Sequence, residues 1–164
     1  MWETLPSADV LYVGDSTWWN YYIDKVQSEF RGECWTLDRR CAHDYDLCHI
    51  EHSDEEGLCI LPGRIHCGSD SGYAAIGLAY QFGARHILLT GFDYQDTGGM
   101  SHSHGDHPQG LGQERPHDKW LARIPKLVAD LRDVGVWVTN CTTQTAIPES
   151  RVQRGDLETC LCES

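Results

Sequence analysis

The chain has 164 residues, which suits one domain with a sizeable core, and 40% of its residues are hydrophobic, as in globular proteins. Its net charge of -12 excludes general nucleic-acid binding, because so acidic a surface repels phosphate backbones. No apolar run approaches the roughly 20 residues that span a bilayer, and the N-terminal residues lack the basic and apolar regions of a signal peptide. We therefore expect a cytoplasmic protein with no membrane association.

Two elements are predicted at the start of the chain. The apolar run of residues 8–13 predicts a strand that is broken at Gly14, and Asp15 or Ser16 can cap the helix that follows. The helix is expected over residues 18–30, because its apolar side chains recur close to one face.

The next part of the chain is more polar. A second strand is predicted for residues 33–37. Residues 38–57 are polar and acidic, so we expect a solvated loop. Two short apolar runs, residues 58–61 and 64–67, are separated by a Pro-Gly pair, which is typical of a hairpin or of two strands joined by a turn.

A Gly/Ser-rich turn, residues 68–72, then leads into a predicted helix over residues 73–82. Residues 85–91 predict a buried strand, and we expect the strand to end at Asp93, two residues after this apolar run.

A third helix is predicted over residues 118–134, where Pro125 indicates a kink or a later start. Residues 136–139 form the last predicted strand, and the tail from Ser150 is expected to be irregular.

The chain has eight cysteines, and without a secretion signal we expect them to be reduced thiols. Those in strand-like runs, such as Cys67 and Cys141, would act as small buried hydrophobes. A zinc site drawn from the cysteines and histidines of residues 34–52 is the alternative, although their spacing fits no zinc knuckle. Cys160-x-Cys162 lies in the tail, where we expect it to face solvent.

Strands that alternate with helices indicate an α/β protein with an open, mostly parallel sheet and helices on both faces, a Rossmann-like fold. We expect residues 1–164 to form a single domain. Ligands in such sheets bind at the carboxyl ends of the strands. This edge would carry all of the small polar clusters: Gly14 and Asp15, residues 68–72, Asp93, and residues 140–145.

The turn before the helix of residues 73–82 is a candidate anion site. Ser69, Ser71 and Gly72 bring backbone N–H groups to a helix N-terminus, which favours a phosphate, and Gly72 permits close approach. Ordinary capping by Ser or Asp is the alternative. The pattern is not a P-loop, because the Gly-Lys-Ser/Thr ending is absent, and it is not the dinucleotide GxGxxG.

Polar residues also follow two of the predicted strands. Asp93 could bind a ribose, orient a base or hold a metal, and a capped turn is the alternative. Asn140, Thr142 and Thr143 offer an amide and hydroxyl groups that suit phosphate, ribose or sugar hydroxyls. They could equally cap a C-terminal turn.

A histidine-rich loop comes after Asp93. His102, His104, Asp106 and His107 match the HxHxDH metal motif of the metallo-β-lactamases and could hold zinc or a metal pair. In that family the motif directly follows an apolar strand, whereas here eight residues intervene. A histidine that acts as general base is the second interpretation, and a solvated loop is the third. The sequence assigns no definite cofactor, and a divalent metal stays optional.

Four segments in this order resemble the norphogenetic proteins of phages: DVLYVGDSTWW, SGYAAIGLAYQFGARHILLTGFDYQ, HSHGDHPQGL and VTNCTTQTAI. Those proteins are distantly similar to bacterial sialyltransferases and to hydroxymethylpterin diphosphokinases. The resemblance implies a nucleotide or nucleotide-sugar ligand near Ser71, Gly72 and Asp93. It also assigns the histidine loop to this family rather than to a lactamase fold.

Proteins of this family usually begin with a further strand and a glycine-rich loop that would help to hold nucleotide phosphates, and this sequence starts just after that point. The sequence is compatible with three functions. The first is a glycosyl- or diphosphoryl-type transferase, in which Asp93 orients the ligand and His104 or His107 takes the acceptor proton. The second is a binding protein that sequesters a nucleotide without turnover, and the third is a metal-dependent hydrolase that uses the histidine loop. We expect a homo-oligomer, in the host cytoplasm if a phage encodes it.

Overall fold

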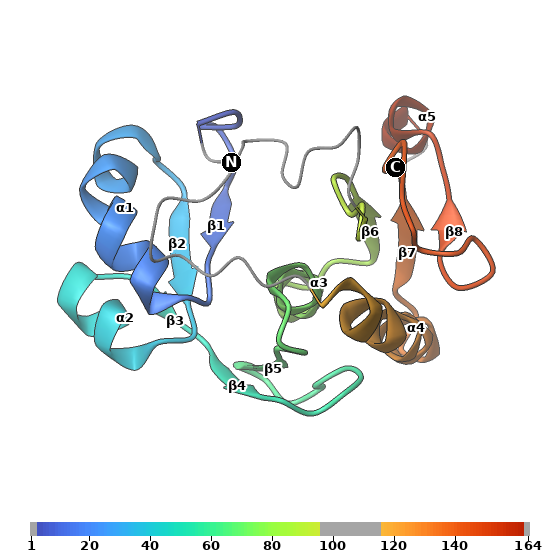
Figure 1. Ribbon diagram of the computed structural model, residues 1–164, viewed down its shortest axis with the longest axis horizontal. Helices are drawn as coiled ribbons and strands as arrows, with labels where there is room; N and C mark the ends of the chain where they lie inside the picture. The colour runs from blue at the N-terminus through green and yellow to red at the C-terminus, as the bar shows by residue number, and fades with distance from the viewer. Residues whose placement is uncertain (1–2, 96–115, 163–164) are drawn as a thin grey trace. The chain divides into compact units, whose positions relative to one another are not determined.

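The computed structural model describes residues 3–95 and 116–162 (Figure 1). These residues fall into two compact units, residues 3–52 and residues 53–95 with 116–162. In chain order the elements are β1 (Val10–Tyr12), α1 (Ser16–Glu29), β2 (Glu33–Thr36), α2 (Arg39–Tyr45), β3 (Cys48–His49), β4 (Glu51–Ser53), β5 (Arg64–His66), α3 (Ser71–Gln81), β6 (His86–Leu89), α4 (His117–Asp133), β7 (Trp137–Asn140), β8 (Gln153–Arg154) and α5 (Leu157–Cys162).

The first unit is a small parallel sheet in the order β1-β2-β3 with α1 and α2 beside it (Figure 1). Asp15 caps α1 by accepting a hydrogen bond from the Thr17 N–H at 2.7 Å, which confirms the predicted cap. The apolar face of α1 is buried in a core that α1 and α2 share with β1: Leu11, Trp19, Ile23, Val26, Phe30 and Cys41.

The prediction that residues 38–57 form one solvated loop is wrong, because they contain α2, β3 and β4. The α2 helix is held by its ends rather than by a long apolar face. The Asp38 carboxylate accepts the Cys41 N–H at 2.8 Å, and Asp46 closes the helix in the left-handed conformation at φ 57°. Only Cys41 is buried within α2, so the apolar pattern was too sparse to predict a helix.

The second unit contains the parallel sheet β6-β7-β8, with Ile87 opposite Val138 and Leu89 opposite Asn140 (Figure 1). The predicted helices α3 and α4 are confirmed, and each begins one or two residues earlier than expected. Their apolar faces form one core with the sheet, which includes Tyr73, Ile76, Leu89, Ile124, Leu127, Val128, Leu131 and Val138. This core holds the start of α3 and the ends of β6 and β7 in fixed positions.

Three expectations for the second unit are wrong. Residues 58–61 form no strand, and β5 pairs with β4 instead of with that run. The tail is not irregular, because it contains β8 and α5, and Val152 just before β8 is fully buried. The later start of the third helix is also wrong, since α4 begins at His117 and continues through Pro125. A kink at Pro125 stays a prediction.

The fold is thus mixed α/β with small open sheets, and each strand pairing recorded in the two three-stranded sheets is parallel. This confirms the predicted α/β class. The finer arrangement, a single Rossmann-like sheet in one domain, stays a prediction. Among the helices of residues 3–95 and 116–162, none is long and apolar enough to cross a membrane.

Candidate functional site

The turn before α3 is built around Asp70. Its carboxylate caps the helix, with Oδ1 accepting the Gly72 N–H at 3.0 Å and Oδ2 accepting the Tyr73 N–H at 3.3 Å. The preceding Ser69 has a left-handed backbone, φ 56°, and both Ser69 and Ser71 are exposed. The capping alternative is therefore present in the structure, and Asp70 would compete with an incoming anion for two N–H groups of the first turn.

Two side chains from other segments meet this turn. The Tyr94 hydroxyl, from the loop after β6, donates a hydrogen bond to Asp70 Oδ2. Trp120 Nε1, from the first turns of α4, donates to the Ser69 carbonyl oxygen at 2.9 Å. Burial, followed by the charge of Asp70 and the hydrogen bond to it, raises the pKa of the Tyr94 hydroxyl far above its usual range. The Tyr94 hydroxyl therefore keeps its proton and can donate it to the Asp70 carboxylate.

An aromatic cluster, consisting of Phe92, Tyr94, His117 and Trp120, lies beside the turn. The ring centroids are 6.1 Å apart for Phe92 and Tyr94, 6.3 Å for Tyr94 and Trp120, and 5.8 Å for His117 and Trp120. A Cβ atom on Gly72 would lie only 2.8 Å from the Phe92 ring. Gly72 therefore allows the aromatic cluster to approach the start of α3, which is a structural reason for a glycine there.

Hydrogen bonds join the segments that follow β6 and β7. The Phe92 N–H donates to Thr142 Oγ1 at 2.9 Å, and the Thr145 hydroxyl donates to the Phe92 carbonyl oxygen at 2.6 Å. Asn140 Oδ1 accepts the Thr142 N–H at 3.0 Å. Asn140 and Thr142 are buried, so their polar atoms support the site from within.

The second unit brings together most of the predicted ligand residues. Ser69, Ser71 and Gly72 form the turn before α3. Asp93 lies between two members of the aromatic cluster, and its carbonyl oxygen accepts the Ala146 N–H at 2.8 Å. The remaining members are Asn140 and Thr142, which are buried, and Thr143, which is exposed.

The other predicted residues lie elsewhere. Gly14 and Asp15 belong to the first unit, where Asp15 is occupied in capping α1. The histidine-loop residues His102, His104, Asp106 and His107 lie outside the described residues, so their catalytic and metal-binding roles stay predictions. Within residues 3–95 and 116–162, including the cysteine- and histidine-rich stretch 34–52, no group of three His, Cys, Asp or Glu side chains could hold a metal.

Sequence reasoning missed three contributors to this site. Tyr94 and Trp120 are not among the predicted ligand residues, and Thr145 belongs to the polar cluster of residues 140–145 without any predicted link to Phe92. The signal for Tyr94 was present, because an aromatic residue directly after a strand-ending Gly-x-Asp is at the ligand edge of the sheet. Trp120 carried no such signal, since its position suits the apolar face of a helix equally well.

Comparisons with family models, curated proteins and solved structures found no match to this chain. The resemblance to phage norphogenetic proteins, and the function that it implies, therefore stay predictions.

Proposed function

We propose that this chain binds a nucleotide or nucleotide sugar at the turn before α3 and the adjacent aromatic cluster. In this proposal the fold is Rossmann-like and the reaction is a glycosyl- or diphosphoryl-type transfer. The observation that carries it is the meeting of Asp70, Tyr94 and Trp120, from three separate segments, around two exposed serines. A carboxylate, exposed hydroxyls and aromatic rings in one place suit the sugar and base of a nucleotide.

The chemistry of each part supports this ligand class. Stacking of a base on an aromatic side chain is worth about 1–3 kcal/mol. Tyr94 and Trp120 are aromatic side chains of the kind on which bases stack. Sugar hydroxyls can donate to the Asp70 carboxylate and accept from the serine hydroxyls. Because Asp70 already engages two N–H groups of α3, we expect a sugar hydroxyl rather than a phosphate nearest to it.

The transfer step would use residues beyond this cluster. Asp93, in the loop that follows β6, would orient the ligand. A histidine of the loop, His104 or His107, would accept the proton of the attacking hydroxyl as general base. Both histidines lie outside the described residues, so this assignment rests on the sequence.

Calorimetry with a panel of nucleotides and nucleotide sugars tests the binding site. Trp120→Ala should weaken binding roughly fivefold to a hundredfold, the equivalent of one lost stacking contact. Trp137→Ala is the matched control, because Trp137 is 58% exposed and lies at the amino end of β7. Equal losses in the two variants, or no binding of any compound in the panel, would contradict the proposed site.

Turnover is tested separately, by recovering the bound compound after incubation with acceptor. His104→Ala and His107→Ala are compared with His43→Ala, which removes an exposed histidine of α2. Loss of product in one loop variant alone supports the general base. A ligand recovered intact from the wild type would instead identify a sequestering protein. Stoichiometric metal in protein purified without a histidine tag would favour the hydrolase.

A further inference from the structure

Two cysteine side chains meet at the carboxyl end of β7. Cys141 directly follows β7, and Cys160 lies on α5, nineteen positions later in the sequence. Both sulfur atoms lie within 4 Å of the position that a Cβ atom on Gly155 would take, so the two thiols are close to each other. Both are half-buried, so a small reagent can reach them, and both are reduced here.

Gly155 makes this approach possible. A Cβ atom on Gly155 would lie 2.8 Å from Cys160 Sγ, 3.9 Å from Cys141 Sγ and 2.6 Å from the Thr139 methyl carbon. Any larger residue would therefore occupy the space that the Cys160 sulfur needs to reach β7. The proximity of the two thiols therefore depends on the packing of three segments: the end of β7, the turn at Gly155, and α5.

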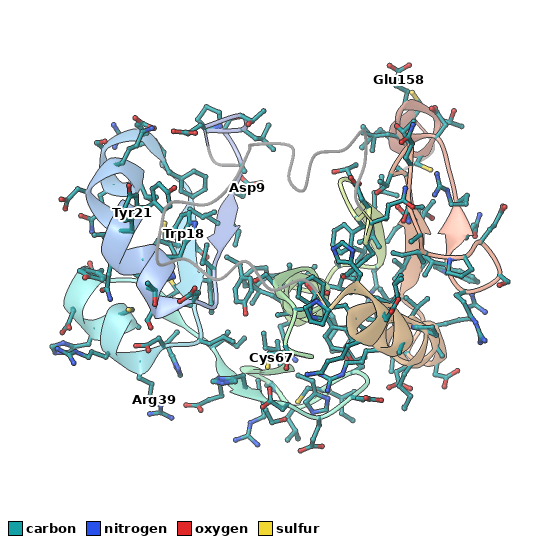
Figure 2. The ribbon with its side chains drawn as sticks, in the orientation of Figure 1. Asp9, Trp18, Tyr21, Arg39, Cys67 and Glu158 are labelled. Atoms are coloured by element: carbon teal, nitrogen blue, oxygen red, sulfur yellow. The ribbon has the colours of Figure 1, made fainter. Side chains whose placement is uncertain are left out.

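The backbone around Cys160 is fixed independently of the thiols. The Gly155 N–H donates to the Asn140 carbonyl oxygen at 3.2 Å, and the Arg154 guanidinium donates to the Thr142 carbonyl oxygen. The Asp156 carboxylate caps α5 through the Thr159 N–H at 2.9 Å. Glu158, on the same short helix, is exposed and points away from the sheet (Figure 2). Cys160 is thus held on the side of α5 that faces β7.

We propose that Cys141 and Cys160 are a redox pair. They form a disulfide when the protein reacts with a low-molecular-weight disulfide, and the new bond fastens α5 to the end of β7. In the reaction one protein sulfur attacks the reagent and releases its first thiol, which leaves a mixed disulfide on the protein. The second protein sulfur then attacks this mixed disulfide and displaces the other half of the reagent as its second thiol. One S–S bond forms in the protein and one breaks in the reagent. The two protein thiols lose two protons and two electrons, and the reagent leaves as two thiols.

The surroundings of Cys141 make this closure slow at neutral pH. Burial, followed by the hydrogen bond with Cys160, raises the pKa of the Cys141 thiol; the nearby Asp156 carboxylate acts in the same direction and the Arg154 guanidinium in the opposite one. The thiolate is the attacking species. Because little thiolate is present below the pKa, the rate of closure should rise with pH, by up to about tenfold per unit.

The test uses the full chain, first reduced and then incubated with oxidised glutathione. Free thiols are alkylated and the product is digested with trypsin, which should release residues 133–151 and 155–164. The second peptide contains both Cys160 and Cys162, so Cys162→Ser serves as the background in which the link is unambiguous. We expect the two peptides to be joined in the wild type and in Cys162→Ser, and separate in Cys160→Ser.

A second measurement examines the fastening itself. In the oxidised protein the amide hydrogen of Gly155 should exchange at least about tenfold more slowly than in the reduced protein. Unchanged exchange would contradict the fastening. A link from Cys141 to Cys162, a glutathione adduct that never resolves on either cysteine, or no link at all would overturn the redox pair. These readouts are independent of any nucleotide ligand.

Discussion

The Tyr94 hydroxyl donates to the same Asp70 oxygen that accepts the Tyr73 N–H at the start of α3. One carboxylate therefore caps a helix and anchors the loop after β6. The loop after β6 and the start of α3 are therefore coupled, because a movement of Tyr94 removes one hydrogen bond from the carboxylate that caps α3. A ligand that bound at the aromatic cluster would act on α3 through this oxygen.

Replacement of the cap should loosen the start of α3. Asp70→Ala removes the acceptor for the Gly72 and Tyr73 N–H groups, which typically costs about 1 kcal/mol, and it also leaves the Tyr94 hydroxyl without this acceptor. Tyr94→Phe removes only one hydrogen bond, so its cost should be smaller. Amide hydrogen exchange at Gly72 and Tyr73 measures both effects.

Asp15→Ala is the control for this experiment, because Asp15 caps α1 in the first unit in the same manner. It should accelerate exchange at Thr17 and leave Gly72 unchanged. If Tyr94→Phe accelerated exchange at Gly72 as much as Asp70→Ala does, the helix would depend on the tyrosine rather than on the cap.

The hydrogen bond from the Phe92 N–H to Thr142 Oγ1 joins the segments that follow β6 and β7, and we expect its loss to lower the free energy of unfolding. Thr142→Val keeps the shape of the side chain but leaves the Phe92 N–H without its acceptor, at a cost of about 1–3 kcal/mol. Urea unfolding measures the loss. Thr143→Val, on an exposed neighbour, should change stability by less than about 0.5 kcal/mol. Equal costs would show that valine disturbs this loop for another reason.

The elements that the sequence predicted well are those with a regular apolar face. The faces of α1, α3 and α4 recur at helical spacing, and the strands β6 and β7 are buried runs between turn signals. The short helices α2 and α5 carry no such face. They depend on the capping carboxylates Asp38 and Asp156 and on contacts with neighbouring segments, which local periodicity cannot reveal.

For the candidate site, the sequence predicted the location but not the role of each residue. Its location followed from the rule that polar residues gather where parallel strands end. The role of each residue did not follow, because partners such as Phe92 and Thr142 are 50 positions apart in the sequence. The contact of Cys160 with Cys141 was hidden for the same reason, and the expectation that Cys160 simply faces solvent is wrong.

Acid should weaken the link between α4 and the segment before β5. Burial alone would raise the pKa of the Asp130 carboxyl, but hydrogen bonds from Lys126 and from the Leu58 N–H outweigh it and hold the pKa below its ordinary value. A lowered pKa in the folded state means that this stabilisation is present above the unfolded pKa of about 3.9 and is lost as the pH falls further.

Urea unfolding at a series of pH values checks this effect. The wild type should lose up to about 1 kcal/mol relative to Asp130→Asn as the pH falls below about 4, because the variant has no carboxylate to protonate. Asp133→Asn, which removes an exposed carboxylate from the same helix, controls for the change of charge. Parallel pH profiles for the wild type and Asp130→Asn would refute the role of Asp130.

Two glycines of α3 should respond to alanine with opposite signs. At Gly77 the nearest atoms to an added Cβ are 3.5 Å away on Ile65, an ordinary contact, so Gly77→Ala should stabilise the helix by roughly 0.5–1 kcal/mol. At Gly72 the added Cβ would meet the Phe92 ring at 2.8 Å and the Tyr94 hydroxyl at 3.3 Å. Gly72→Ala must displace these rings, at a cost of about 1–3 kcal/mol. Urea unfolding gives both signs, and the ligand affinity of Gly72→Ala should fall together with its stability. If Gly72→Ala stabilised the protein as Gly77→Ala does, the close packing of the aromatic cluster on α3 would be disproved.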